Sequence, residues 1–378
     1  MTREHFQAAF AALVNANAED PNKDAADGKA YSKERLCAQR MTTTLERSPL
    51  RMAFSNCRFL PEATTEHAAA IRSSITQRRN TMNIKSVLLS ALLLFGASGA
   101  LADDVKLKPF VLASKAAGAV EEKIAQTKTA LTGAGFSIVG DYSPYANAHV
   151  LIITSDELKK NAADSERGGY GAVQRVSVTK VNDDVQVSYT NPVYMANVYR
   201  MKSELSDVSG KLAAALGKVE EFGAQGMTAG QARKYHYMLG MEYFDEPGVL
   251  AEYGSYEEAV QAVDAKLAGN KNGVSKVYRV DIPGKSESVF GVSMKGEGDN
   301  KYMDDQFIMK EIDFRDVKST AHLPYEVLVS GGKVYALYAR FRIAINFPDL
   351  SMMGKNSFMN IMKAPEAIRL ALQKTVQP

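Results

Sequence analysis

An internal repeat is the feature that most constrains how this chain of 378 residues folds. The stretch that begins at Ala119 can be aligned with the stretch that begins at Tyr256, and each opens with mostly apolar residues at helical spacing. The stripes are formed by Val120, Ile124, Thr127 and Leu131 in the first copy and by Val260, Val263 and Leu267 in the second. We therefore expect two copies of one folding unit, each with an amphipathic helix.

The segments after these helices have the same spacing in both copies. After each helix come a glycine stop, a short strand, a proline turn and a second strand. These segments lie at Gly133 and Gly135, residues 136–139, Pro144 and Val150 in the first copy, and at Gly269 and Gly273, residues 277–280, Pro283 and Val289 in the second. The second strand begins six residues after the proline in both copies, and this equal spacing supports the alignment.

A β-hairpin and a helix close each copy. The hairpins are Arg175–Val181 with Val185–Tyr189 and Tyr325–Val329 with Val334–Tyr338, and the closing helices lie near residues 208–216 and 364–373. Strands joined by short turns predict an α+β fold of two tandem two-layer α/β-sandwich repeats with mainly antiparallel sheets. We place the first repeat at residues 103–217, a linker with a helix at 218–254 and the second repeat at 255–378.

Residues 82–102 have the plan of a secretory signal peptide. Lys85 is followed by an apolar run and then by small residues that end in an A-x-A pattern at Ala102, which predicts a mature start at Asp103. The apolar run is shorter than a membrane-spanning helix needs, so we expect no transmembrane segment after cleavage. The expected location is therefore periplasmic or secreted. Residues 1–81 are then an extension or a gene remnant, expected to be largely disordered.

Charge and cysteine usage exclude several classes of protein. The chain carries 46 Lys and Arg against 43 Asp and Glu, so it lacks the basic surface that binds nucleic acid. Both cysteines, Cys37 and Cys57, precede the predicted cleavage point, so the exported part uses neither a disulfide nor a thiol nucleophile. That part also lacks the common nucleophile, zinc and phosphate-loop motifs. These patterns favour a protein that is not an enzyme, and they indicate no cofactor.

The first hairpin and its exit, VQVSYTNPVYMANVYRM at residues 185–201, resemble the domain-of-unknown-function family number 302. Residues 234–253 look like the segment found in two-copy exported members of that family, and the likeness covers most of 119–373. The resemblance implies a two-layer α+β sandwich and an exported setting, and it implies no established activity. About 35 residues at the start of the chain resemble a fragment of family number 4202, and this implies no function.

The end of the first hairpin carries a candidate ligand site, formed by Tyr189, Asn191, Pro192, Tyr194 and Met195. An Asn-Pro pair breaks a strand and starts a turn. A strand end with an amide and two phenols also forms a hydrogen-bonding rim at the mouth of a cleft. A turn without a ligand is the simpler interpretation.

The last strand expected in the second copy carries a pair of cations, Arg340 and Arg342, which alternate with the apolar residues Phe341 and Ile343. On a strand, this spacing places both guanidinium groups on one face, where they are able to hold a carboxylate or a phosphate. A solvated sheet face or a protected sheet edge is the competing interpretation.

A third candidate is a metal site formed by His236, Met238 and Met241. In a periplasm, an imidazole beside thioether ligands suits copper, because soft sulfur ligands select Cu(I). The alternative is that these residues pack in an aromatic linker helix. The other methionines of the second repeat fill a core or line an adaptable apolar groove.

The preferred function is non-catalytic binding of a small apolar or amphipathic ligand in the crevice between the two repeats. The alternative is an accessory module that binds a protein partner in the cell envelope, and the third hypothesis is periplasmic copper binding. A small-ligand binder is expected to hold a closed apolar pocket, whereas a partner-binding protein exposes a flat apolar patch.

Overall fold

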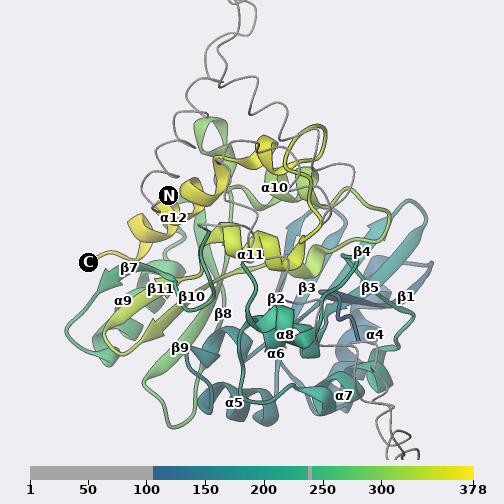
Figure 1. Ribbon diagram of the computed structural model, residues 1–378, viewed down its shortest axis with the longest axis horizontal. Coiled ribbons are helices and arrows are strands. Elements are labelled where there is room, and N and C mark those ends of the chain that lie inside the picture. Colours follow the sequence, from purple (N-terminus) through teal and green to yellow (C-terminus); the bar gives the residue numbers. More distant parts are fainter. Residues whose placement is uncertain (1–104, 237–240) are drawn as a thin grey trace, which may run out of the picture. The chain divides into compact units, whose positions relative to one another are not determined.

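The structure is a computed structural model that describes residues 105–236 and 241–378, and it contains two antiparallel sheets with helices around them (Figure 1). The predicted extension, the signal peptide, both cysteines and Met238 lie outside the described residues. Within the described ranges, none of the helices combines the length and the apolar character that crossing a bilayer requires.

The first sheet has six strands in the order β2-β3-β4-β5-β1-β6. Its strands are β1 Phe110–Ala117, β2 Ser137–Tyr145, β3 Ala148–Thr154, β4 Gln174–Val181, β5 Asp184–Thr190 and β6 Glu220–Phe222. Its α-helices are α4 Val120–Gly133, α5 Asp156–Ala163, α6 Pro192–Val198 and α7 Ser206–Leu216, and a 3-10 turn, η1, spans Gly168–Gly171. The short helix α8, Ala229–Arg233, follows β6.

The second sheet has five strands in the order β7-β11-β10-β9-β8. Its strands are β7 Gly248–Glu252, β8 Val274–Asp281, β9 Glu287–Met294, β10 Tyr325–Ser330 and β11 Lys333–Ala336. Its α-helices are α9 Tyr256–Ala268, α10 Asp305–Ile312, α11 Ala339–Asn346 and α12 Ala364–Val376. Its 3-10 turns are η2 Lys271–Gly273, η3 Gly298–Met303, η4 Thr320–His322 and η5 Phe358–Ile361.

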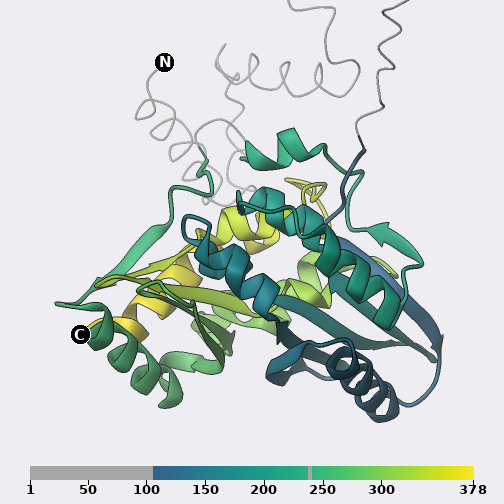
Figure 2. The ribbon, with the colours of Figure 1, turned by 90° about the horizontal axis from the view of Figure 1, so that it is seen from below.

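The two sheets share one topology, which confirms the predicted α+β fold with two antiparallel sheets. The order β2-β3-β4-β5-β1 in the first sheet corresponds to β8-β9-β10-β11-β7 in the second, and helices occupy equivalent positions between the strands. Helices α4 and α7 pack together over the first sheet, as α9 and α12 do over the second (Figure 2). Each repeat is thus a layer of strands under a layer of helices.

The helices form where the apolar stripes predict them. Thr127 and Leu131 of α4 are buried, as are Val260, Val263 and Leu267 of α9. The α9 helix begins at a Ser255 cap, whose side chain accepts the Glu258 N–H at 3.1 Å. After α4, Gly135 takes a φ of +85°, a left-handed conformation that glycine adopts at little cost.

Three local expectations were wrong. Pro144 does not form a turn, because β2 continues through it to Tyr145; β2 is an edge strand, where a proline removes no ladder hydrogen bond. The second hairpin ends at Ala336, because Leu337 and Tyr338 leave the strand and Tyr338 caps the start of α11. The range 218–254, expected to be a linker, contributes β6 to the first sheet and β7 to the second.

The two repeats make reciprocal contacts through their 3-10 turns. The η1 turn of the first repeat lies against β9 and β10, and the η4 turn of the second lies against β3, β4 and β5. The hydrophobic core around the first sheet therefore includes buried residues of the second repeat, such as Tyr278, Val289 and Leu328. Residues from both repeats thus share one continuous packed interior.

Candidate functional site

The two repeats meet closely at the η1 turn, whose sequence is Gly-Gly-Tyr-Gly. The Gly169 N–H donates to Oε1 of Glu287 on β9 at 2.8 Å. A Cβ atom placed on Gly169 would lie 2.5 Å from the side chain of Leu328 on β10. A larger residue at this position would therefore force the buried Leu328 side chain to move.

An open groove of about 450 Å³ lies beside this turn and is lined by residues of both repeats. We call it the inter-repeat groove; its lining residues are Ala163, Asp164, Ser165, Glu166, Arg167, Lys285, Glu287, Ser330 and Tyr335. It differs from the closed apolar pocket expected for a small-ligand binder, because it is open and its lining is mixed. A larger groove of about 720 Å³ lies between α12 and η3, but the second repeat alone lines it.

Charged groups converge in the inter-repeat groove. Glu287 is 2% exposed, and Nζ of Lys285 lies 3.8 Å from its Oε2 while donating to the Ser165 carbonyl. The Arg167 guanidinium lies 5.9 Å from the centre of the Tyr335 ring. Arg167 has a φ of +48°, a left-handed conformation that costs a bulky residue about 1–3 kcal/mol and is common at functional sites.

The groove presents charged and apolar groups side by side. Arg167 and Lys285 are partly exposed cations that are able to hold a carboxylate or a phosphate group. The ring of Tyr335 and the methyl group of Ala163 offer apolar contact beside them. The buried carboxylate of Glu287 fixes the position of Lys285 and offers an acceptor within the same groove.

A buried ionic network also joins the two repeats. Glu326 on β10 pairs with Arg175 of β4 through Oε1 and with Nε of Arg342 on α11 through Oε2, the latter at 2.9 Å. Arg342 also contacts Nδ1 of His322 at 3.2 Å. Burial and the two nearby arginines hold the pKa of His322 well below its usual value, so this imidazole is neutral. The charged side chains are 1–3% exposed, so this network is placed to bind the repeats to one another.

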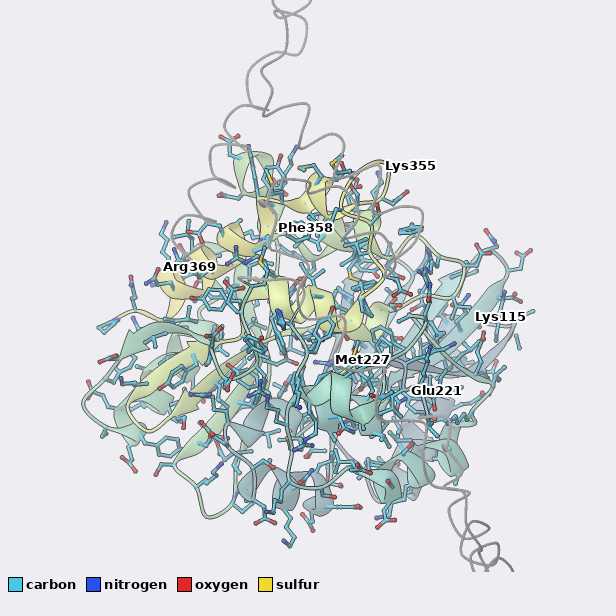
Figure 3. The ribbon with its side chains drawn as sticks, viewed as in Figure 1. Lys115, Glu221, Met227, Lys355, Phe358 and Arg369 are labelled. Carbon is cyan, nitrogen blue, oxygen red and sulfur yellow. The ribbon has the colours of Figure 1, made fainter. Side chains whose placement is uncertain are left out.

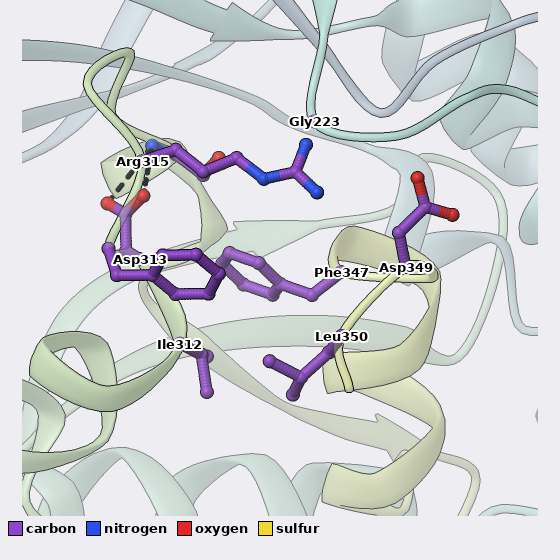
Figure 4. A pocket seen from close by; sticks show the side chains of 9 residues that line it. Gly223, Ile312, Asp313, Arg315, Phe347, Asp349 and Leu350 are labelled. Carbon is purple, nitrogen blue, oxygen red and sulfur yellow. Dashed lines mark hydrogen bonds between the residues drawn. The ribbon is translucent and has the colours of Figure 1, made fainter. Parts of the chain in front are cut away.

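A small hollow lies between the loop after α10 and the end of α11 (Figure 4). Its volume of about 20 Å³ has room for a water molecule. Both carboxylate oxygens of Asp313 accept the Ser319 N–H, at 2.9 and 3.0 Å, and burial raises the pKa of Asp313 to about 7. Asp313 therefore holds the loop before η4 in place.

The candidate rim at the end of the first hairpin is buried. Tyr189 and Tyr194 are both 0% exposed, and their hydroxyl groups donate to backbone carbonyls, at 3.3 Å to Gly217 and at 2.6 Å to Ile345. Met195 is also buried. The expected hydrogen-bonding rim is therefore not present at these residues, since their polar groups bind the protein itself.

Asn191 has a structural role in the same segment. Its Nδ2 donates to the Lys108 carbonyl at 2.9 Å and to Oε2 of Glu221 at 3.1 Å, and Glu221 lies on the edge strand β6 (Figure 3). The following Pro192 occupies the first turn of α6, where a proline is tolerated. The Asn-Pro pair thus ties the start of a helix to the segment just before β1 and to β6, which agrees with the simpler interpretation.

The arginine pair was assigned to the wrong kind of element. Arg340 and Arg342 lie on helix α11, where residues two apart point about 200° away from one another, so they do not share a face. Arg342 is 1% exposed and belongs to the buried network. Arg340 is partly exposed and pairs with Glu242.

The copper hypothesis receives little structural support. Helix α8 ends at Arg233, so the expected linker helix does not include His236 or Met241. The His236 ring packs on Tyr243 with a centroid distance of 4.4 Å, and Met238 lies outside the described residues. In the described part of the chain, no three His, Cys, Asp or Glu residues are grouped so that they are able to hold a metal ion.

The inter-repeat groove was missed because its parts are far apart in the sequence. Gly169 and Glu287, which meet through a hydrogen bond, are separated by 118 positions. The one available signal was the run Gly168-Gly169-Tyr170-Gly171, because several glycines within four residues indicate close backbone approach.

Comparisons with known proteins add no further information on the site. No family model, curated protein or solved structure matches the chain. The resemblance to family number 302 therefore stays a hypothesis that rests on residues 185–201 and 234–253.

Proposed function

We propose that the protein is exported and binds a small amphipathic molecule in the inter-repeat groove without chemically changing it. The observation that carries this proposal is a charged, partly buried groove lined by both repeats, with the 2% exposed carboxylate of Glu287 at its wall. A carboxyl group is costly to bury unless it has partners, and Glu287 has Lys285 and the Gly169 N–H beside it, so the groove is suited to polar recognition.

The proposed ligand carries an anionic group and a small apolar part. The anionic group binds Arg167 and Lys285, which face the groove from the first and the second repeat respectively. The apolar part lies against Tyr335 and Ala163. Because the two cations come from different repeats, the ligand contacts both units, and its affinity depends on how the repeats are placed.

A native mass spectrum of the protein expressed from its own gene tests this proposal. We expect a discrete extra mass on the wild-type chain and its loss from the Arg167→Ala, Lys285→Ala double variant. The matched control is Arg369→Ala, which removes a partly exposed arginine on α12 that pairs with Glu366 (Figure 3). Two results would contradict binding in this groove. One is a wild-type spectrum without the extra mass, and the other is loss of the extra mass from Arg369→Ala to the same extent as from the double variant.

A partner-binding role is the second candidate, and exposed apolar side chains near the C-terminus favour it. Phe314, Met353 and Met359 are 49%, 69% and 41% exposed. Met353 lies on the loop before η5 and Met359 lies in η5, and the Met359 N–H donates to the Met352 carbonyl at 3.1 Å. Replacing Met353 and Met359 by Gln is expected to release a bound envelope protein in a pull-down from the exported fraction while leaving the groove ligand in place.

A further inference from the structure

A serine, a histidine and an aspartate lie in contact on the β2–β3 hairpin, away from the inter-repeat groove. Ser143 Oγ is 3.0 Å from Nδ1 of His149, and Nε2 of the same ring is 2.5 Å from Oδ1 of Asp141. Asp141 and Ser143 are two residues apart on β2, so they share a face, and His149 projects from the neighbouring strand. The hydroxyl of Ser143, a candidate nucleophile, thus contacts His149, a candidate base. His149 in turn contacts Asp141, which is placed to orient it.

A β-bulge produces this contact. In the ladder between β2 and β3, Tyr142 pairs with Val150 and Tyr145 pairs with Ala148, so two residues of β2 lie opposite the single residue His149. The extra residue disrupts the regular ladder and re-aims the side chains around it. Bulges of this kind are over-represented next to active sites, where they direct a functional side chain.

The surroundings suit a reactive serine. Ser143 is exposed, and the side chain of His149 is only 15% exposed, so a substrate reaches the hydroxyl while the imidazole is held. Lys128 of α4 pairs with the other oxygen of Asp141, which helps to hold that side chain in place. Nε2 makes no well-formed hydrogen bond, so Asp141 acts on the ring as a neighbouring carboxylate, and the tautomer with its proton on Nε2 is the one that leaves the Nδ1 lone pair for the Ser143 hydroxyl.

We propose that Ser143 is a nucleophile that accepts an acyl group from small esters, with His149 as its general base and Asp141 as a positioning residue. Oγ attacks the ester carbonyl carbon while Nδ1 of His149 takes the hydroxyl proton. The bond from that carbon to the leaving alkoxide breaks, and the alcohol departs with the proton from His149. Asp141 stabilises the imidazolium that exists between these two transfers.

In the return step, water attacks the acyl-serine carbonyl as Nδ1 of His149 takes a proton from it. The bond to Oγ breaks, the acid leaves, and Ser143 regains its proton from His149. The reaction therefore consumes one ester and one water and yields one acid and one alcohol. It is distinct from ligand binding in the inter-repeat groove and does not depend on it.

The test uses the full chain and an alkyl fluorophosphonate, whose phosphorus is attacked by a serine with loss of fluoride. We expect one adduct, mapped to Ser143 by peptide mass spectrometry. It should be lost in Ser143→Ala and kept in Ser137→Ala, which removes an exposed serine of the same strand. His149→Ala is expected to slow labelling about 100-fold, the usual contribution of a general base, and added imidazole should restore much of the rate.

Two results would overturn the proposal. One is labelling that is absent or that falls on Ser137 and other exposed serines as readily as on Ser143. The other is labelling of Ser143 at an unchanged rate in His149→Ala, since the contact with the imidazole would then have no chemical effect. Circular dichroism of each variant shows that it is folded, and imidazole rescue separates a chemical role of His149 from a structural one.

Discussion

Replacing Glu326 by Gln is expected to destabilise the protein severely. Glu326 is the single carboxylate between the guanidinium groups of Arg175 and Arg342, and all three side chains are 1–3% exposed. Glutamine keeps the shape but removes the charge, so two arginines stay buried without compensation. Breaking a buried pair in this way costs about 3–5 kcal/mol. For a folded part of this size, that loss lowers the melting temperature by roughly 5–9 °C.

The measurement is urea unfolding of the wild type and the variant, followed by circular dichroism and by tyrosine fluorescence. The matched control is Glu252→Gln, which removes an exposed partner of Lys333 at 3.2 Å and is expected to cost less than about 1 kcal/mol. Arg175 belongs to the first repeat and Glu326 to the second. The unfolding curves of the variant by circular dichroism and by tyrosine fluorescence are therefore expected to have different midpoints. A loss equal to that of the control would refute the reasoning that this network holds the repeats together.

Three further predictions concern burial. Burial raises the pKa of Asp305 to about 8; its unfolded value is near 4, so the folded state holds the proton more tightly and stability falls as the pH rises from about 4 to about 8. Urea unfolding at pH 5 and pH 8 should show this fall, and Asp305→Asn should make it smaller. Gly169→Ala should cost about 1–3 kcal/mol in thermal unfolding because its Cβ clashes, whereas Gly210→Ala, in open space on α7, should stabilise by about 0.5–1 kcal/mol. Asn191→Ala should cost about 1–3 kcal/mol through two lost hydrogen bonds and leave the native mass spectrum's extra mass unchanged, and loss of that mass would return Asn191 to the ligand site.

Local patterns predicted the parts of the fold that local physics controls. The α4 and α9 helices follow from apolar residues at 3.6-residue spacing, and the hairpin of β4 and β5 follows from alternation around the turn at residues 182–183. In each case the residues that form the element are neighbours in the chain. The repeated order of these elements then predicted two sheets of one topology.

Helix α11 shows where a local pattern fails. Its sequence alternates Arg340, Phe341, Arg342 and Ile343, which is the period of a strand. The segment is nevertheless a helix in which seven of eight residues are buried. A helix buried on nearly all sides has no polar stripe to reveal its period, and Arg342 tolerates burial because Glu326, from another strand, neutralises it.

The sequence alone therefore determined the internal repeat, the antiparallel α+β fold and the helices with a clear apolar stripe. Tertiary structure decided the sites, because each is formed by side chains that only folding brings together. The inter-repeat groove joins Arg167 to Lys285, and a bulge places Ser143 on His149. The physical reason is that a charged side chain is held in position by its partner in the folded protein. The local sequence around the charge does not show which residue that partner is.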